Sequence, residues 1–439
     1  MIPRPGGRLR PPAELPLPGR RQLTGVLPVL LPRGRIRSAL VYFGPAFVAS
    51  VAYVDPGNFA TNFEAGSAHG YLLVWVILLA DLLGILIQYA TSKLGLVTQR
   101  SLPELCGDLY PKGVNLFLWG QAEIVAMAAD LAEVVGAAIG LNLVFGLPLL
   151  PAGLVTAVVA FGVLALERKG YRQFELAIVA FMALVAGGLI GLFFMAGHQS
   201  YGGIAAGLVP RLGNTNAVTL AMGIVGATVM PHVVYLHSAL QTDRIQPRDE
   251  EELRRLIRFN RWDCVVGLGV AGLVNLAMLC VAAALFYRSG MPAVTQLQEV
   301  HVHLAAMVGG GAALAFGAAL IAAGLSSSSV GTYAGQVVMA GFMNWRVPLY
   351  LRRLVTIAPS LLVLAFAANT TDALVYSQVV LSFAIPFALV PLTLLTSRRD
   401  VMGSGVNRTI TSGFLGASTV AITTLSAYLL WKVGKGLVG

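Results

Sequence analysis

Long apolar runs recur along the chain from about residue 39 to its end. They are continuous blocks, without the strict polar and apolar alternation of a membrane β-barrel, so they predict helices. A helix needs about 20 mostly apolar residues to cross a bilayer. The pattern predicts an all-α polytopic membrane protein, and the eighth of its runs is long enough to include a re-entrant or interfacial part. The predicted spans are 39–64, 70–92, 114–142, 149–166, 173–197, 216–240, 262–287, 303–340, 353–368, 374–396 and 410–433.

The composition supports this fold class. Of the 439 residues, 56% are hydrophobic and only 11% are charged, whereas soluble proteins carry roughly 25% charged residues. The mean hydropathy is +0.76. The three cysteines are widely spaced and form no CxxC pair, which argues against a zinc ribbon or a disulfide framework.

The net charge of +10 is a signal of topology and not of nucleic-acid binding. Of the 30 Lys and Arg residues, 26 lie in the tail 1–38 or in the loops after even-numbered spans. This is the positive-inside distribution. It predicts a cytoplasmic N-terminus in a plasma or inner membrane and, after eleven crossings, an extracellular or periplasmic C-terminus. The tail is expected to be flexible, and 243–261 to form an amphipathic cytoplasmic helix.

Two spans are interrupted near their middle. The first contains Asp55-Pro56-Gly57-Asn58, and the sixth contains Met230-Pro231-His232. Proline removes a backbone donor, and unpaired backbone at membrane depth survives only where it is buried or lines a cavity. Matching breaks in two halves point to a midplane transport site, and a five-span unit must be inverted when it is repeated. We therefore expect repeats at 39–197 and 216–396, an external loop at 198–215, a cytoplasmic loop at 397–409, and an eleventh helix with the C-terminus at 410–439.

The residues around these breaks suit a transition metal. A carboxylate at membrane depth costs about 2.5–3.5 kcal/mol to insert and is functional by default, so Asp55 is a candidate ligand. Asn58 lies one turn further on and brings an amide oxygen to the same side. Unwinding frees carbonyls such as those of Ala52 and Ala227, and Met230 adds a thioether. Such a mixed set favours a transition metal over a hard cation. Gln378 is expected to join the coordination shell in one conformation.

A second group of polar residues suggests a proton pathway that starts from Asp55. On the third span, Glu123, Asp130 and Glu133 share one stripe of a helix, and acids inside a membrane indicate a proton relay. Arg352 and Arg353 are either their partners or cytoplasmic anchors. His232 follows the second break. An imidazole side chain can bind a metal, but it also ordinarily titrates near neutral pH. A role in the proton path or in gating is favoured for it over metal ligation.

The chain resembles the Nramp family of proton-coupled divalent-metal transporters over almost all of 44–392. The resemblance implies a LeuT-like fold of two inverted five-helix repeats plus an eleventh helix, with helices 1 and 6 unwound at the midplane and Mn²⁺ or Fe²⁺ as substrate. Two departures, Val233 where the family usually has Asn and Ala384 where many members have Gln, alter the polarity of the pathway. The matching segments are GPAFVASVAYVDPGNFATN (44–62), AEIVAMAADLAEVVGAAIGL (122–141), ERKGYRQFE (167–175), GATVMPHVVYLHSAL (226–240), SSSSVGTYAGQVVMAGF (326–342) and SQVVLSFAIPFALVPL (377–392).

We therefore expect a secondary active transporter that imports Mn²⁺, Fe²⁺ and also Cd²⁺ with protons by alternating access. Its partners would be these ions, protons and the lipid bilayer, with no cofactor and no nucleic acid, and we expect it to act as a monomer. An amino-acid or cation symporter of the same fold is the alternative, although Asp55 would repel a substrate carboxylate. An intramembrane enzyme is disfavoured because neither GxSxG nor HExxH occurs.

Overall fold

The computed structural model describes residues 44–438 apart from 170, 198, 243, 245, 246, 248, 346, 367 and 368. The tail 1–38 lies outside the described residues. Within the described ranges the regular structure is helical and contains no strand. Seven helices in these ranges are long and apolar enough to cross a membrane.

Each predicted span corresponds to one helix or to a broken pair. The first span is the pair α3 (Pro45–Ala52) and α4 (Pro56–His69), and the sixth is α11 (Thr215–Thr228) and α12 (Pro231–Gln241). The remaining long helices are α5 (Val74–Thr98), α7 (Lys112–Phe145), α8 (Leu149–Lys169), α9 (Tyr171–Met195), α13 (Glu250–Ala282), α15 (Gly310–Met343), α16 (Leu349–Phe366), α17 (Thr370–Thr396) and α19 (Thr409–Val438). The short ones are α6 (Leu102–Leu109), α10 (Tyr201–Ala206), η2 (Ala283–Tyr287), α14 (Leu297–Met307), α18 (Arg399–Met402) and η3 (Gly403–Gly405).

Two boundaries differ from the prediction. The amphipathic segment expected at 243–261 is not a separate helix, because its described part from Glu250 continues into α13. No Gly or Pro stands between Glu250 and the apolar run to interrupt the backbone. The long eighth span, in contrast, is divided into two helices. The helix α14 ends at Met307, Gly309 adopts a φ of 122°, and α15 begins at Gly310.

Proline removes one helical hydrogen bond at each of the two breaks, although α16 and α17 continue through Pro359, Pro386 and Pro391. In a continuous helix the N–H of each residue donates to the carbonyl four residues earlier. Pro56 has no N–H to donate to Ala52, and Pro231 has none to donate to Ala227. The residue before each proline leaves the helical region, as expected for that position: Asp55 has φ −77° and ψ 169°, and Met230 has φ −72° and ψ 119°.

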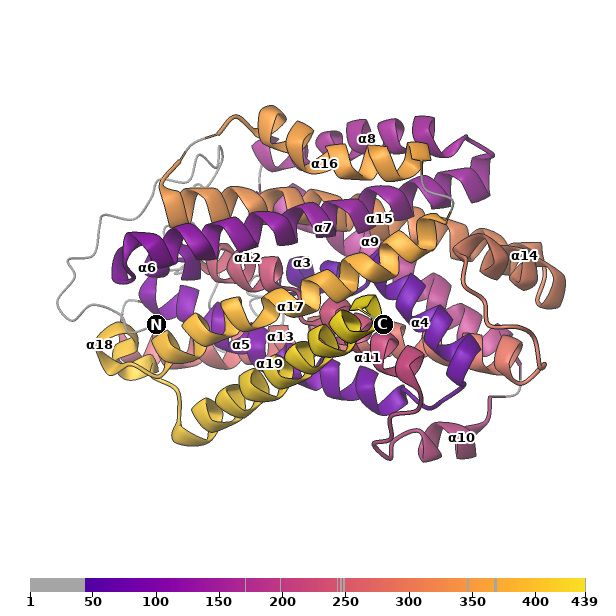
Figure 1. The fold of residues 1–439 in the computed structure, drawn as a ribbon. Helices are drawn as coiled ribbons and strands as arrows, with labels where there is room; N and C mark the ends of the chain where they lie inside the picture. The colour runs from indigo at the N-terminus through magenta and orange to yellow at the C-terminus, as the bar shows by residue number, and fades with distance from the viewer. Residues whose placement is uncertain are drawn as a thin grey trace.

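The broken helices lie inside the bundle and are held at close range by α7 and α17 (Figure 1). A Cβ on Gly136 of α7 would come within 1.9 Å of Pro56 Cβ. A Cβ on Gly226 of α11 would come within 2.0 Å of the Gln378 carbonyl oxygen on α17. Only glycine permits these approaches, so both breaks are fixed against neighbouring helices.

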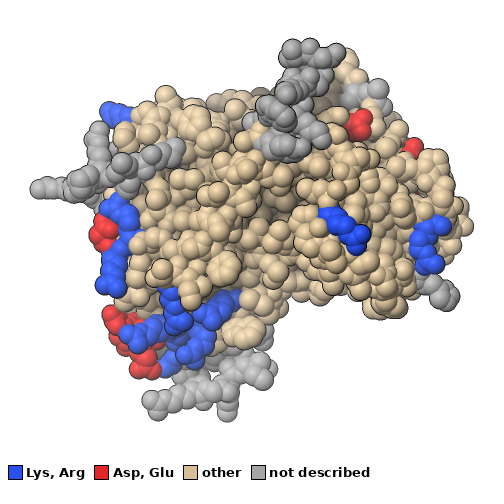
Figure 2. All heavy atoms as spheres, turned by 60° about the horizontal axis from the view of Figure 1, so that its bottom comes forward, with Lys and Arg blue, Asp and Glu red and all other residues tan. Residues whose placement is uncertain are grey.

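The surface is divided as a membrane protein requires. Figure 2 shows charged side chains gathered toward the ends of the visible face, with a broad uncharged area between them. Large apolar side chains are exposed on many helices, for example Leu82, Val158 and Phe194 at 66%, 72% and 75%. Exposed apolar surface on this scale is a mark of contact with lipid. The chain is a multi-pass membrane protein.

The predicted sidedness can be tested by labelling single cysteines. The three native cysteines are buried, so they give little background. Leu212→Cys, at a position 48% exposed before α11, should react with a membrane-impermeant maleimide in intact cells. Arg399→Cys, exposed at the start of α18, should react only after permeabilisation. The reverse pattern would overturn the predicted orientation.

Candidate metal site

The two helix breaks are joined by a short chain of hydrogen bonds. Asp55 caps α4, and its Oδ1 accepts hydrogen bonds from the Asn58 backbone N–H and from Asn58 Nδ2, both at 2.8 Å. Asn58 Nδ2 also donates to the Ala227 carbonyl oxygen at 3.1 Å. That carbonyl is the one that Pro231 leaves without its helical partner. The first break is thereby connected directly to the second.

Three buried oxygens at this junction have no hydrogen-bond partner among the described residues. They are Asp55 Oδ2, Asn58 Oδ1 and Gln378 Oε1. Each of the three side chains is at most 1% exposed. Buried polar atoms are normally paired, so unpaired acceptors from a carboxylate and two amides indicate a place for a cation.

The structure brings the other predicted ligands to the same junction. Ala52 ends α3, and Met230 is 1% exposed and caps α12. Gln378 lies against the first break, because a Cβ on Gly57 would come within 2.0 Å of Gln378 Nε2. No group of three or more His, Cys, Asp or Glu side chains that could hold a metal occurs in the described ranges. A site here would rely on Asp55 together with amide, carbonyl and thioether groups.

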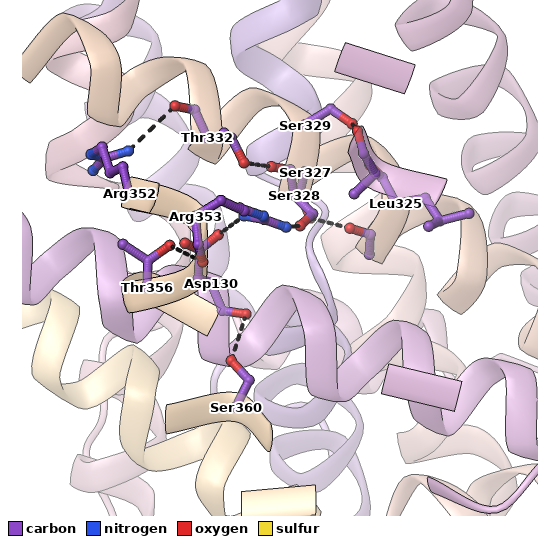
Figure 3. Close-up of polar contacts among 12 residues, drawn as sticks. Asp130, Leu325, Ser327, Ser328, Ser329, Thr332, Arg352, Arg353, Thr356 and Ser360 are labelled. Carbon is purple, nitrogen blue, oxygen red and sulfur yellow. Dashed lines mark hydrogen bonds and ion pairs between the residues drawn. The ribbon is translucent and has the colours of Figure 1, made fainter. Parts of the chain in front are cut away.

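A second polar cluster joins α7, α15 and α16 (Figure 3). Arg353 on α16 is 2% exposed and forms an ion pair with Asp130 on α7 and a hydrogen bond to Ser328 on α15. The Ser360 hydroxyl donates to the Asp130 carbonyl oxygen at 3.3 Å. A buried guanidinium is stable only when its charge is paired and its donors are used. Asp130 supplies the opposite charge that the buried Arg353 guanidinium needs.

Arg352 forms the outer member of this cluster. Its guanidinium pairs with Glu123 on α7 at 3.1 Å and donates to the Thr332 carbonyl oxygen at 3.4 Å. Gly335 makes room for it, since a Cβ there would come within 1.7 Å of Arg352 Nη1. The two arginines thus form ion pairs with Glu123 and Asp130 of the acidic stripe.

Glu133 and His232 lie near this cluster and carry buried polar atoms that have no hydrogen-bond partner among the described residues. Glu133 is 1% exposed, its Oε2 has no partner among the described residues, and a Cβ on Gly331 would come within 3.0 Å of its carboxylate oxygens. Neither ring nitrogen of His232 has a partner in the same ranges. Gly136, which touches Pro56, is one turn beyond Glu133 on α7. This contact connects the helix break to the acidic stripe.

The sequence alone assigned no role to several polar residues that the structure places in contact with others. Ser328 sits in a serine run whose neighbours bond their own helix, so the sequence does not distinguish it. Gln88 on α5 donates to the Tyr53 hydroxyl and bonds His237 Nδ1, both at 2.9 Å. Asn275 on α13 donates to the Tyr53 carbonyl oxygen at 3.0 Å. A polar side chain inside an apolar run was the available signal for Gln88 and Asn275.

Comparison with known proteins places this geometry in a family. The family described as natural resistance-associated macrophage protein-like, Nramp, matches residues 46–432. The chain is 46% identical over 405 residues to the divalent metal cation transporter MntH of Deinococcus radiodurans, covering 92% of each chain. It is 44% identical over 397 residues to MntH of Bacillus subtilis, covering 90% of this chain and 92% of the relative.

Solved structures agree with the sequence comparison. The crystal structure of an Eremococcus coleocola manganese transporter in complex with an aromatic bis-isothiourea substituted compound has a TM-score of 0.80 and 31% identity. The match covers 90% of this chain and 87% of that one. Mhp1, a nucleobase-cation-symport-1 family transporter in a closed conformation, has a TM-score of 0.59 at 14% identity, over 98% of this chain and 97% of that one. The second likeness shows the fold alone.

Gly136 provides a test of the contact between α7 and the first break. Gly136→Ala places a methyl group 1.9 Å from Pro56 Cβ. Overpacking of this kind destabilises the fold by about 1–3 kcal/mol. The part of the strain that displaces Asp55 from its binding position weakens metal binding, and 1.4 kcal/mol is a tenfold change in affinity. We expect Mn²⁺ binding, measured by calorimetry, to weaken about tenfold or more. The matched control is Gly120→Ala on the same helix, where no atom lies within 4 Å, and equal affinities in the two variants would contradict the role of the contact.

Proposed function

The chain belongs to the Nramp family, whose members are transporters and not enzymes, and from this premise we propose that it imports Mn²⁺ together with protons by alternating access. Fe²⁺ and Cd²⁺ would be further substrates. The observation that carries this proposal is the set of unpartnered buried oxygens on Asp55, Asn58 and Gln378 between two broken helices. The names of the relatives, divalent metal cation transporters and a manganese transporter, support the same substrate class.

In this proposal the metal ion is bound at the junction of the breaks. Asp55 supplies the negative charge, and Asn58 and Gln378 supply amide oxygens. The carbonyls of Ala52 and Ala227 supply further oxygens, because prolines have removed their helical donors. Met230 supplies a sulfur, which bonds transition metals and has little attraction for Mg²⁺ or Ca²⁺. Gln378 would complete the shell in one conformation of the transport cycle.

Beyond Asp55, protons would take a separate route along α7. We propose that Asp55 accepts a proton from the outside and that Glu133 and Asp130 receive it next, with His232 beside the path. The ion pairs of Arg353 with Asp130 and of Arg352 with Glu123 lead from there to the cytoplasmic side. A negative-inside potential favours inward movement by about 2.3 kcal/mol per charge per 100 mV. The two routes share Asp55 and separate beyond it, so metal and proton can move in the same direction while the other metal ligands carry no proton.

The direct test is metal uptake into proteoliposomes with and without an inward pH gradient. Mn²⁺, Fe²⁺, Cd²⁺, Mg²⁺ and Ca²⁺ would be compared at equal free concentrations. We expect uptake of the first three to be faster with the gradient and the last two to be excluded. Uptake at the same rate with and without the gradient would refute the proposed proton coupling. Faster uptake of Ca²⁺ than of Mn²⁺ would refute the proposed substrate class.

Met230 should determine selectivity. In Met230→Ala the sulfur is replaced by space that water or another oxygen can fill, which suits hard ions. Cd²⁺ uptake should fall most, by about tenfold for a lost ligand worth ~1.4 kcal/mol, while Mn²⁺ uptake persists and Ca²⁺ begins to compete. Met222→Ala, which removes another fully buried methionine from α11, controls for packing. Unchanged discrimination between Cd²⁺ and Ca²⁺ would show that Met230 only fills space.

Asp130 should matter for protons more than for metal. Asp130→Asn removes the charge that Arg353 pairs with, while the junction between the breaks keeps its ligands. Proton flux, followed with a pH-sensitive dye in the vesicles, should fall at least tenfold with Mn²⁺ affinity changed much less. Asp108→Asn breaks a different buried ion pair, with Arg100 at 2.6 Å, and should leave proton flux intact. Full proton flux with lost metal affinity in Asp130→Asn would be the opposite of the proposal.

A further inference from the structure

One buried carboxylate belongs neither to the candidate metal site around Asp55 nor to the polar cluster around Arg352 and Arg353. Asp81 lies on α5, seven residues after the helix begins at Val74, which is about 10 Å along its axis from the end expected to face outside. It is 7% exposed. Neither of its carboxylate oxygens makes a hydrogen bond of normal geometry among the described residues, although the Asn275 side chain approaches it. An acid in this position is a functional candidate by default.

The neighbouring helix α13 is shaped around this carboxylate. A Cβ on Gly272 would come within 2.6 Å of Asp81 Oδ2, so only glycine leaves the space that the oxygen occupies. Asn275 follows three residues later on α13. Its Nδ2 donates to the Tyr53 carbonyl oxygen, and its Oδ1 accepts from Asn62 Nδ2, both at 3.0 Å. The segment of α13 that contacts Asp81 therefore also binds the backbone of Tyr53, two residues before Asp55 at the first break.

The same face of α5 follows the first break further inward. Asp81, Gly84 and Gln88 are spaced i, i+3 and i+7 and share one stripe. A Cβ on Gly84 would come within 2.7 Å of Tyr53 Cε1, and Gln88 bonds the Tyr53 hydroxyl. A displacement of the broken pair α3 and α4 along α5 would consequently change the surroundings of Asp81.

No charged partner compensates Asp81. The helix α11, which packs on α5, has no titratable side chain between Thr215 and Thr228. The helices α6 and α18 contact α5 as well, and Gly405 beside α18 lies against Val97 at the opposite end of α5. None of the titratable side chains near the rest of α5 forms an ion pair or hydrogen bond with Asp81 in the described ranges. These side chains include the cations Lys93 and Arg261, which lie at the Tyr89 end of α5, together with Tyr53, His232, Tyr235, His237, Asp263, Cys264, Cys280, Asp372 and Tyr376.

Physical chemistry limits what such a carboxylate can hold. An ionised carboxylate without a partner at membrane depth is expensive, whereas a protonated one is neutral and carries an O–H donor. A bound Na⁺ or Ca²⁺ would need several further oxygens, and the side-chain oxygen of Asn275 already accepts a hydrogen bond. A proton is the ligand that satisfies the site without additional groups.

We propose that Asp81 is a second proton-binding site, distinct from the route through Asp55 and Asp130. In this packing an O–H bond is formed on one carboxylate oxygen. When the first helix moves relative to α5 and α13 and water reaches the niche, that bond breaks and the proton passes to water. The inference rests on the proposed function, because it adds a conformation-linked proton to a metal–proton transport cycle.

The protonation state can be observed directly by infrared spectroscopy. The full-length protein in lipid vesicles at neutral pH should show a protonated carboxyl C=O absorption that is lost in the isosteric variant Asp81→Asn. Asp372→Asn removes an exposed carboxylate at the start of α17 and should leave that absorption unchanged. If the Asp81→Asn spectrum differs from that of the wild type only by the loss of an ionised carboxylate band, the proposal is overturned.

Transport measurements then distinguish a working site from a static neutral group. We expect Asp81→Asn to lower the number of protons taken up per Mn²⁺ in proteoliposomes, with Mn²⁺ affinity retained, and Asp81→Glu to restore the ratio. An unchanged ratio in Asp81→Asn, or a Na⁺ or Ca²⁺ stimulation that only Asp81→Asn loses, would refute the inference. If wild-type protein itself takes up no protons with Mn²⁺, the proposed function fails instead, and the two failures are therefore separable.

Discussion

The structure depends on two backbone N–H groups that the chain lacks. Pro56 and Pro231 cannot donate to the carbonyls of Ala52 and Ala227, and both helices break at these positions. Water is not available there to satisfy the freed groups. The protein answers in part with Asn58, which bonds both Asp55 and the Ala227 carbonyl. The unpaired side-chain oxygens of Asp55, Asn58 and Gln378 gather where the helices are interrupted, so the breaks and the candidate site coincide.

Glycine contacts transmit the position of this junction to its neighbours. Gly136 lets α7 touch Pro56, and Gly226 lets α11 touch the backbone of α17 at Gln378. Because Glu133 and Asp130 lie one and two turns before Gly136, a shift of the first break is felt by the acidic stripe and by its partner Arg353. Close-packed interiors transmit such shifts because they contain little free volume. This gives the proposed coupling between metal and proton a continuous physical connection.

The sequence predicted the spans and both breaks because membrane length and proline chemistry are local constraints. It also indicated the polar residues at the junction, whose proposed roles stay predictions. It could not show which helices face each other. The pairing of Arg353 with Ser328, the niche of Asp81 against Gly272 and the fusion of the segment after Glu250 with α13 all depend on lateral packing or on the absence of a stop signal. A single apolar pattern contains little information about such contacts, because almost every face of these helices is hydrophobic.

X-ray absorption at the cadmium edge of the metal-loaded protein in lipid would show directly which atoms bind the ion. We expect a first shell of oxygens with one sulfur, and loss of that sulfur in Met230→Leu, because the three cysteines are buried free thiols and Met230 caps α12 at the break. A shell of oxygens alone in the wild type, or a sulfur that persists in Met230→Leu, would contradict a metal site at the junction of the two broken helices.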